Sequence, residues 1–223
     1  MIITIDGPAG SGKSTAARKL AGRLELPYLD TGAMYRAVAY RAMLVGANLE
    51  DGQALLKIAA EADLVLDCGP TYTRVKLDGH DVSEAIRAFE VNEVTPSVAH
   101  HQGVRDLLVE KQRSIGKTLG SLVTEGRDQG SVVFPGADVK FVLDATLDKR
   151  AERRFQELAA DGQEVPLEQI RDNLATRDRG DAPQWAPLLE PGEAIRIDTT
   201  RLNIAQVVER LVQHIRQITG REF

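Results

Sequence analysis

The chain has 223 residues, of which 43% are hydrophobic and 27% charged, a balance typical of an ordinary folded domain rather than a disordered chain. Its 28 basic against 33 acidic residues give a formal charge of −5, which argues against a nucleic-acid partner and requires any anion site to be local. No apolar run is long enough to span a membrane. The single cysteine and the absence of a basic leader predict a cytoplasmic protein, and we expect a monomer.

The first part of the chain predicts alternating strands and helices. Residues 2–5 form a β-branched run followed by a glycine loop, and residues 13–24 carry apolar side chains at helical spacing. Residues 27–29 predict a second short strand that ends at Asp30, and residues 31–42 predict a second helix. This alternation favours a parallel sheet.

The pattern then changes between about Leu49 and Gly116. Residues 63–77 alternate like a hairpin, with Asp78-Gly79 as a turn, and therefore predict a small antiparallel sheet. We interpret residues 31–116 as an inserted region. Further buried strands of the core are expected at residues 122–124, 139–143 and 194–198.

A charged helix is expected over residues 147–160, followed by a break at Asp161-Gly162 and a second helix over residues 166–176. We interpret about residues 150–170 as a mobile helical lid. The last helix should dock on the core through one apolar face, formed by Ile204, Val207, Val208, Leu211 and Ile215.

The predicted fold class is therefore α/β. We expect a three-layer sandwich with a central parallel sheet flanked by helices, plus the inserted lobe and the lid. Residues 1–30 and 117–223 would form the core.

Residues 7–14, GPAGSGKS, match the phosphate-binding pattern GxxxxGK[ST] at every position and lie between the first predicted strand and helix. The glycines let successive backbone N–H groups point at phosphate oxygens, beside the positive end of the helix dipole. Lys13, which we expect to face solvent, would reach the β- and γ-phosphates, and the Ser14 hydroxyl would bind Mg²⁺. The alternative is a plain glycine turn. The ATP-binding residues would be Gly7, Pro8, Ala9, Gly10, Ser11, Gly12, Lys13, Ser14 and Thr15.

A P-loop alone does not distinguish a kinase from a GTPase or an ATP-driven motor. We find no NKxD-type motif of the kind that GTPases use to read guanine. Motors usually need a longer chain and partner domains. The small chain and its arginine-rich lid segment favour a small-molecule kinase.

Four segments together resemble the bacterial cytidylate kinases across nearly the whole chain, whereas other P-loop kinases share only the first. They are IDGPAGSGKST at residues 5–15, YLDTGAMYR at 28–36, GRDQGSVVFPGAD at 126–138 and RDRGD at 177–181. The resemblance implies a P-loop nucleoside monophosphate kinase that transfers the γ-phosphate of ATP to CMP or dCMP with Mg²⁺. It implies that the acceptor site is formed by Thr31, Arg36, Arg105, Arg127, Asp128, Arg177 and Asp181. The residues assigned to catalysis are Lys13, Arg127, Asp128, Arg177 and Asp181.

The chemistry of CMP suits these residue types. A dianionic phosphate calls for arginines, and the 4-amino group of cytosine calls for an acceptor such as Asp128. Uracil would present a carbonyl oxygen to Asp128 and be repelled. Alternatively, Arg105 is a solvated helix residue, and Arg127 and Asp128 form a local ion pair. Asp30 could stabilise a turn or order water around Mg²⁺.

Other chemically interesting residues have simpler interpretations. His80, His100, His101 and His214 show no metal-ligand spacing, and we expect them at the surface, with His100 and His101 on different sides of a helix. Trp185 is expected in a loop, where it would serve as a packing residue.

The expected mechanism is direct in-line transfer without a phosphoenzyme, because phosphoryl transfer depends on positioning and charge neutralisation. Lid closure would exclude water. The cations that offset the transferred charge would be Lys13, Mg²⁺, Arg150, Arg153, Arg154, Arg177 and Arg179.

The chain departs from the family's usual pattern just after the RDRGD segment, where a further arginine is common. An arginine commonly precedes an (S/A)PL triplet, but here Ala182-Pro183-Gln184-Trp185 precedes Ala186-Pro187-Leu188, one residue shorter than usual. Gln184 stands nearest the missing arginine. We expect Arg179 to replace it, with Arg153 and Arg154 as alternatives.

Two other functions fit the sequence. One is another small-molecule kinase, for UMP, shikimate or dephospho-coenzyme A, and the other is a nucleotide-binding module without turnover. The preference between CMP and dCMP, and the strictness for ATP as donor, stay open.

Overall fold

The computed structural model describes residues 1–160 and 162–221. Its centre is a five-stranded parallel sheet in the order β2 (Tyr28–Asp30), β6 (Leu122–Glu125), β1 (Ile2–Asp6), β7 (Val139–Asp144) and β8 (Ile195–Asp198). The predicted α/β class with a parallel sheet is confirmed. Because β1, β6 and β2 run parallel, the loops that follow them leave the same edge of the sheet. Ligands of α/β proteins bind at this edge.

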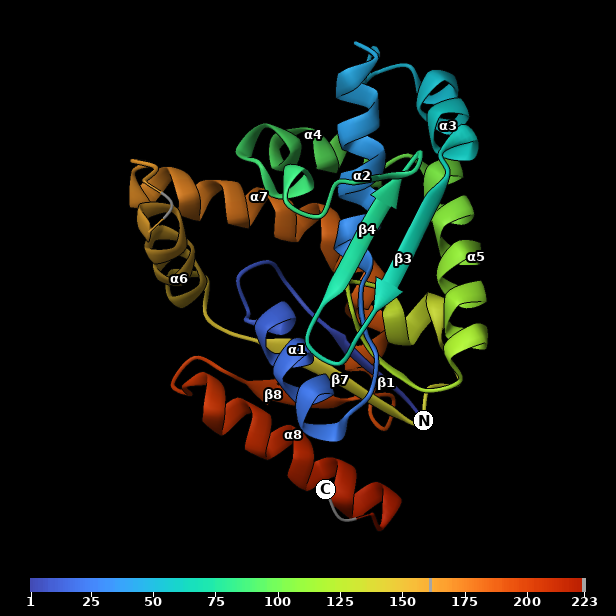
Figure 1. The fold of residues 1–223 in the computed structure, drawn as a ribbon. Helices are drawn as coiled ribbons and strands as arrows, with labels where there is room; N and C mark the ends of the chain where they lie inside the picture. Colours follow the sequence, from blue (N-terminus) through green and yellow to red (C-terminus); the bar gives the residue numbers. More distant parts are fainter. Residues whose placement is uncertain (161, 222–223) are drawn as a thin grey trace.

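Helices cover both faces of the sheet (Figure 1). On one face, α1 (Lys13–Leu24) and α8 (Ile204–Thr219) pack over Ile3, Ile5 and Phe141. On the other, α5 (Gln102–Leu119) and a π-helical turn, η2 (Gln129–Val133), cover Leu122. Successive strand residues face opposite sides, so this arrangement is the expected three-layer sandwich. The predicted docking face of α8 is confirmed: Val207, Val208, Leu211 and Ile215 are buried, and Ile204 is partly buried.

The inserted region stands above the sheet in Figure 1, with α2 (Thr31–Leu44) at its centre. It also contains α3 (Gly52–Glu61), the strands β3 (Leu64–Cys68), β4 (Thr73–Leu77) and β5 (His80–Asp81), the short helix η1 (Ala85–Arg87) and α4 (Phe89–Ala99). The three strands form the predicted antiparallel sheet. Asp78-Gly79 is a turn, as expected, but it joins β4 to β5, whereas residues 69–72 close the β3–β4 hairpin.

The apolar core of this region extends into the first half of α5, since Val104 and Leu108 belong to it. Helix α5 itself continues to Leu119, past the boundary expected at residue 116. The expectation that His100 and His101 share a helix is wrong, because α4 ends at Ala99. His101 caps α5 instead, and its Nδ1 accepts a hydrogen bond from the Val104 N–H at 3.3 Å.

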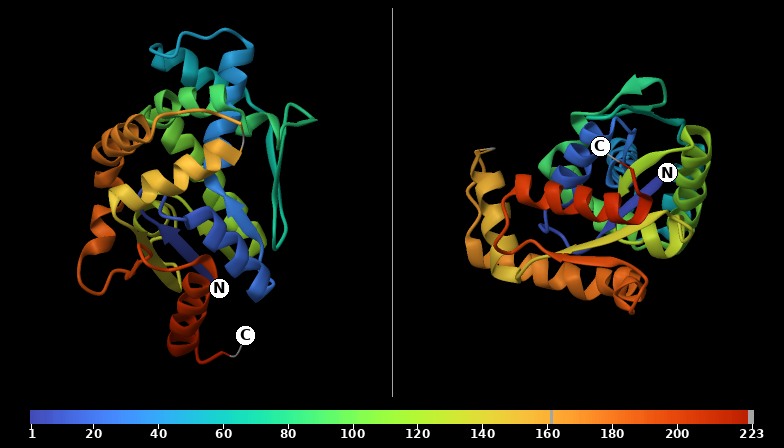
Figure 2. Two further views of the ribbon diagram at one scale, coloured as in Figure 1. Left: turned by 90° about the vertical axis from the view of Figure 1, so that its left-hand side faces the viewer. Right: turned by 90° about the horizontal axis from the view of Figure 1, so that it is seen from below.

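The lid expected at about residues 150–170 falls on α6 (Leu147–Ala160) and α7 (Leu167–Trp185), and α6 contacts the P-loop through Arg150 and Ala9 (Figure 2). Leu158, Ile170 and Leu174 form a small core between the two helices. The predicted end of the second helix at residue 176 is wrong. Ion pairs from its second half to neighbouring elements outweigh the helix-breaking tendency of Gly180 and Pro183.

Because α7 continues to residue 185, Trp185 lies at a helix end rather than in the expected loop. It is partly buried, and a short helix, η3 (Ala186–Leu189), follows directly. The predicted break at Asp161 lies outside the described residues. Gly162, which follows it, has a left-handed φ of 74°. Within the described part of the chain, no helix is long and apolar enough to cross a membrane.

Candidate active site

The P-loop connects β1 to α1, and its glycines adopt backbone conformations that other residues rarely take, as Gly7 and Gly12 show. Gly7 has φ of 133°, and a Cβ there would lie only 2.1 Å from the carbonyl oxygen of Leu143 in the neighbouring strand. Gly12 precedes α1 in a left-handed conformation, with φ of 92°. The loop therefore passes close to β7 and places the N-terminus of α1 at the edge of the sheet, where its positive end can meet an anion.

Lys13 is buried, with 5% of its surface exposed, so the expectation that it faces solvent is wrong. Its Nζ donates a hydrogen bond to the carbonyl oxygen of Pro8 at 2.8 Å. Burial and the nearby Arg127 lower the pKa of Lys13 to about 7, against the opposing effect of Glu125. The lysine is thus held inside the loop by a neutral backbone acceptor, the Pro8 carbonyl oxygen. Phosphate oxygens bound in the loop would offer it charged acceptors instead.

Glu125, at the end of β6, is a site residue that the sequence reasoning missed. It is buried, its Oε1 accepts a hydrogen bond from Ser14 Oγ at 2.9 Å, and burial raises its pKa. A serine hydroxyl and a carboxylate are the hard oxygen ligands that Mg²⁺ prefers, so this pair fits a magnesium site. The available signal was an acidic residue that ends a buried strand beside the P-loop strand.

Asp30 performs the first of its two expected roles. Its Oδ1 accepts from the Ala33 N–H at 2.9 Å and thereby caps α2. Its Oδ2 pairs with Nη2 of Arg36 at 2.9 Å. The carboxylate thus orients an arginine that points into the cleft.

A cleft of about 350 Å³ brings the predicted residues together at this edge of the sheet. They come from the P-loop, α2, α5, the loop after β6 and α7. All seven predicted acceptor residues line it, together with Lys13 and Ser14: Thr31, Arg36, Arg105, Arg127, Asp128, Arg177 and Asp181.

Arg105 and Asp128 form an ion pair across the cleft, from Nη2 to Oδ2. The Arg105 side chain is only 15% exposed, so the alternative of a freely solvated helix residue is wrong. Asp128 also accepts a hydrogen bond at Oδ1 from Gln129 Nε2 at 3.3 Å. Arg127 pairs with Asp181 instead, from Nε to Oδ2 at 3.0 Å, so it is not the local partner of Asp128.

Asp6, at the end of β1, is a second residue that the sequence reasoning missed. It accepts hydrogen bonds from the backbone N–H groups of Gln129 and Gly130, both at 2.8 Å, and so fixes η2 immediately after Asp128. Burial raises its pKa to about 7, opposed by these hydrogen bonds. We assign Asp6 a structural role, because it holds the backbone that carries Asp128.

Two of the predicted lid arginines bind the protein itself. Arg150 donates to the carbonyl oxygens of Ala145 and Ala9, at 3.0 and 3.1 Å, and pairs with both carboxylate oxygens of Asp178, at 3.0 and 2.6 Å. Arg153 donates to Ser11 O at 3.3 Å and to Thr199 O at 2.6 Å. These side chains support the outside of the P-loop.

Of the other three arginines, Arg154 and Arg177 line the cleft and Arg179 does not. Arg177 is exposed to solvent there. Arg154 also pairs with Glu157 at 3.1 Å. Arg179 is exposed, donates to Thr176 Oγ1 at 3.0 Å and does not line the cleft, which argues against it as the replacement cation.

Comparison with known proteins gives a consistent result. The family model for cytidylate kinase matches residues 3–217. A cytidylate kinase from Caldanaerobacter subterraneus subsp. tengcongensis is 44% identical over 99% of this chain and 97% of its own length. A bifunctional pantoate ligase/cytidylate kinase from Synechococcus sp. (strain JA-2-3B'a(2-13)) is 45% identical over 99% of this chain, which spans only 41% of that protein.

The fold also matches solved structures. Shikimate kinase from Bacteroides thetaiotaomicron has a TM-score of 0.52, with coverage of 96% of this chain and 98% of that one. Its sequence identity is only 12%, so this likeness supports the fold alone.

The network around Arg150 generates a stability prediction. Arg150→Met should lower the free energy of unfolding by about 2 kcal/mol, because it leaves Asp178 and two carbonyl oxygens without their charged donor. Arg154→Met, one turn further along α6, removes only a surface pair and should change it by less than about 0.5 kcal/mol. Denaturant unfolding measures both variants. Equal effects would contradict a structural role for Arg150.

Proposed function

The chain belongs to the cytidylate kinase family, and from that premise we propose that it transfers the γ-phosphate of ATP to CMP or dCMP, giving ADP and CDP or dCDP. One observation carries the proposal. A single cleft holds the P-loop lysine together with five arginines and two aspartates, side chains suited to phosphate groups and a pyrimidine base. We further propose a cytoplasmic monomer that acts on free nucleotides. The division into a core of residues 1–30 and 117–223 and an NMP-binding region of residues 31–116 stays a prediction.

In the proposed mechanism, residues of the chain hold the γ-phosphate of ATP in line with the phosphate of CMP and offset the charge of both groups. Lys13 gains charged acceptors when the donor phosphates enter the P-loop. Arg36, Arg127 and Arg177 are suited to hold the acceptor phosphate. Arg36 and Arg127 would then exchange or share their present carboxylate partners, Asp30 and Asp181. Ser14 and Glu125 would hold Mg²⁺, which supplies charge neutralisation at the donor phosphates when bound.

Base recognition is assigned to Asp128. Its carboxylate can accept a hydrogen bond from the 4-amino group of cytosine, whereas the 4-carbonyl of uracil would face it as a second acceptor. Its position is fixed by Gln129 on one side and Arg105 on the other. A rigid, buried acceptor of this kind discriminates well, because the wrong base leaves polar groups unpaired.

An acceptor panel tests the proposed function. CMP and dCMP should have kcat/KM values on the order of 10²-fold or more above those of UMP, AMP and shikimate. Asp128→Asn should narrow the gap between CMP and UMP, since its amide can donate to the uracil carbonyl. Asp67→Asn, an exposed change in β3, is the matched control and should leave the gap unchanged. A coupled assay of ADP release measures all rates, and equal rates for CMP and AMP would refute the base-reading account.

The lid arginines should separate in kinetics. An arginine that touches the transferred phosphoryl group contributes about 10³- to 10⁵-fold, so Arg177→Ala should lower kcat by at least about 10²-fold. We propose that Arg154 supplies the cation missing at Gln184, so Arg154→Ala should cost about tenfold or more. Arg179→Ala serves as the control and should cost less than about threefold. A large loss for Arg179→Ala alone would reverse the assignment.

Donor binding should depend on pH through Lys13. In the free protein its pKa is lowered to about 7, whereas phosphate oxygens favour the charged lysine. Binding of MgATP at about pH 8 should therefore take up a proton, and affinity should fall as the pH rises above about 7. At about pH 6 the lysine is already charged, so no uptake is expected there. Calorimetry in buffers of different ionisation enthalpy measures the uptake, and a buffer-independent heat at the higher pH would exclude this linkage.

A further inference from the structure

We propose that Gln184 is a positioning residue for base recognition: from the end of the lid helix α7, its side-chain oxygen holds Arg105 against Asp128. The inference rests on the proposed function, in which Asp128 reads the cytosine amino group. It gives a role to Gln184, which stands nearest the arginine that the resemblance leads us to expect.

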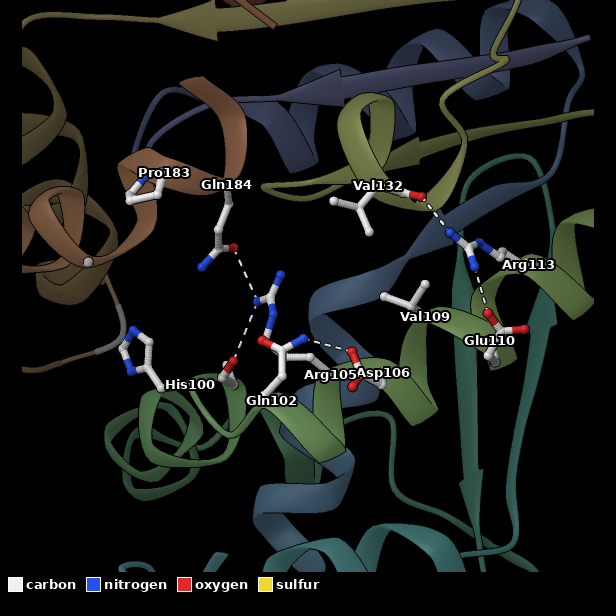
Figure 3. Close-up of a pocket in the computed structure, with 12 residues that line it drawn as sticks. His100, Gln102, Arg105, Asp106, Val109, Glu110, Arg113, Val132, Pro183 and Gln184 are labelled. Atoms are coloured by element: carbon white, nitrogen blue, oxygen red, sulfur yellow. Dashed lines mark hydrogen bonds and ion pairs between the residues drawn. The ribbon is translucent and has the colours of Figure 1, made fainter. Parts of the chain in front are cut away.

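The contacts join three separate parts of the fold. Arg105, on α5, donates from Nη1 to Gln184 Oε1 at 3.2 Å, and from Nη2 to Asp128 after β6 (Figure 3 shows the first contact). The backbone of Gln184 is fixed as well, since its carbonyl oxygen accepts from Ser131 Oγ at 2.8 Å. Lid, inserted region and core thus meet at one guanidinium group.

The position on α7 explains why this side chain reaches the cleft. Arg177, Asp181 and Gln184 are four and three residues apart, so they share one face of the helix, and all three line the cleft. A guanidinium group has donors only and must be held by acceptors. The amide oxygen of glutamine provides an acceptor for Arg105, whereas an arginine at 184 would bring a second cation to the same place.

If the Gln184 acceptor is removed, the Arg105 side chain has a second orientation available to it. Arg105 and Gln184 also line a second groove of about 590 Å³, on which His100, Asp106 and Val132 lie (Figure 3). Asp106 offers a competing carboxylate on that side. The other restraint on the same nitrogen of Arg105 is a long hydrogen bond to Ala99 O, at 3.4 Å. Without Gln184 the arginine can turn toward the groove and release Asp128.

Gln184→Met tests the proposal, because methionine has nearly the same size and offers no comparable acceptor. We expect KM for CMP to rise about tenfold and the ratio of kcat/KM for CMP over UMP to fall about tenfold, the scale of one hydrogen bond to a charged group. The kcat for CMP and the KM for ATP should change by less than about threefold. Gln184→Glu keeps an acceptor at the same place and should retain the wild-type KM and ratio.

Gln169→Met is the matched control, since Gln169 is an exposed glutamine on the same helix α7 and lines neither the cleft nor the second groove. It should leave KM, kcat and the CMP/UMP ratio unchanged. A purely structural role for Gln184 predicts equal effects of methionine and glutamate, and that result would overturn the proposal. So would a Gln184→Met variant with lower kcat and unchanged KM, which would indicate a phosphate contact.

The failure of this inference can be told from the failure of the proposed function. If the wild-type protein phosphorylates CMP and Gln184→Met has the same kinetic constants, only the role of Gln184 is wrong. If the wild-type protein does not phosphorylate CMP, the proposed function fails and this inference with it.

Discussion

The structure depends on keeping several buried or partly buried cations together in a protein whose overall charge is negative. Such cations repel one another, and each loses hydration on burial, so each needs a carboxylate partner or must give up charge. Four ion pairs meet this need, and each joins two different elements or turns: Arg36–Asp30, Arg105–Asp128, Arg127–Asp181 and Arg150–Asp178. Lys13 has a backbone oxygen as its hydrogen-bond partner instead, and accordingly it is the cation whose pKa falls furthest toward neutrality.

These pairs also explain how the lid is attached. Arg150–Asp178 ties α7 to the outside of the P-loop, whereas Arg127–Asp181 ties the same helix to the loop after β6. The two pairs differ in what a ligand can do to them. Arg150 is buried behind the loop, where it keeps its partners, but Arg127 lines the cleft, so an incoming phosphate competes with Asp181 for it. The Arg150–Asp178 pair should therefore persist when a ligand binds, whereas the Arg127–Asp181 pair can be exchanged for a contact with phosphate.

Much of this arrangement follows from local sequence, and the remainder from contacts that no local pattern records. The P-loop, the β–α alternation and the acceptor residues carry signals within a few neighbouring positions, and the cleft brings all of the acceptor residues together. The extent of α7 was missed because its second half is held by Arg127 and Arg150, at least 28 residues away in the chain. Burial of Lys13 follows from the tight loop around it. Asp6 and Glu125 look like ordinary strand ends until the order of the sheet sets them beside the P-loop and η2.

The contact between Gln184 and Arg105 has a consequence for the order of events in recognition. Asp128 and Gln129 follow β6, and Asp6 holds the backbone directly after Asp128, so the acceptor proposed for the base does not depend on α7. Arg105 is different, because one of its two short side-chain contacts comes from α7. The proposed base site would therefore be complete only while α7 is docked against Ser131 and α5. With glutamine at position 184, the same helix carries Arg177 to the cleft and an acceptor to the partner of the proposed base reader. Selection of the base and placement of the lid would then share one element.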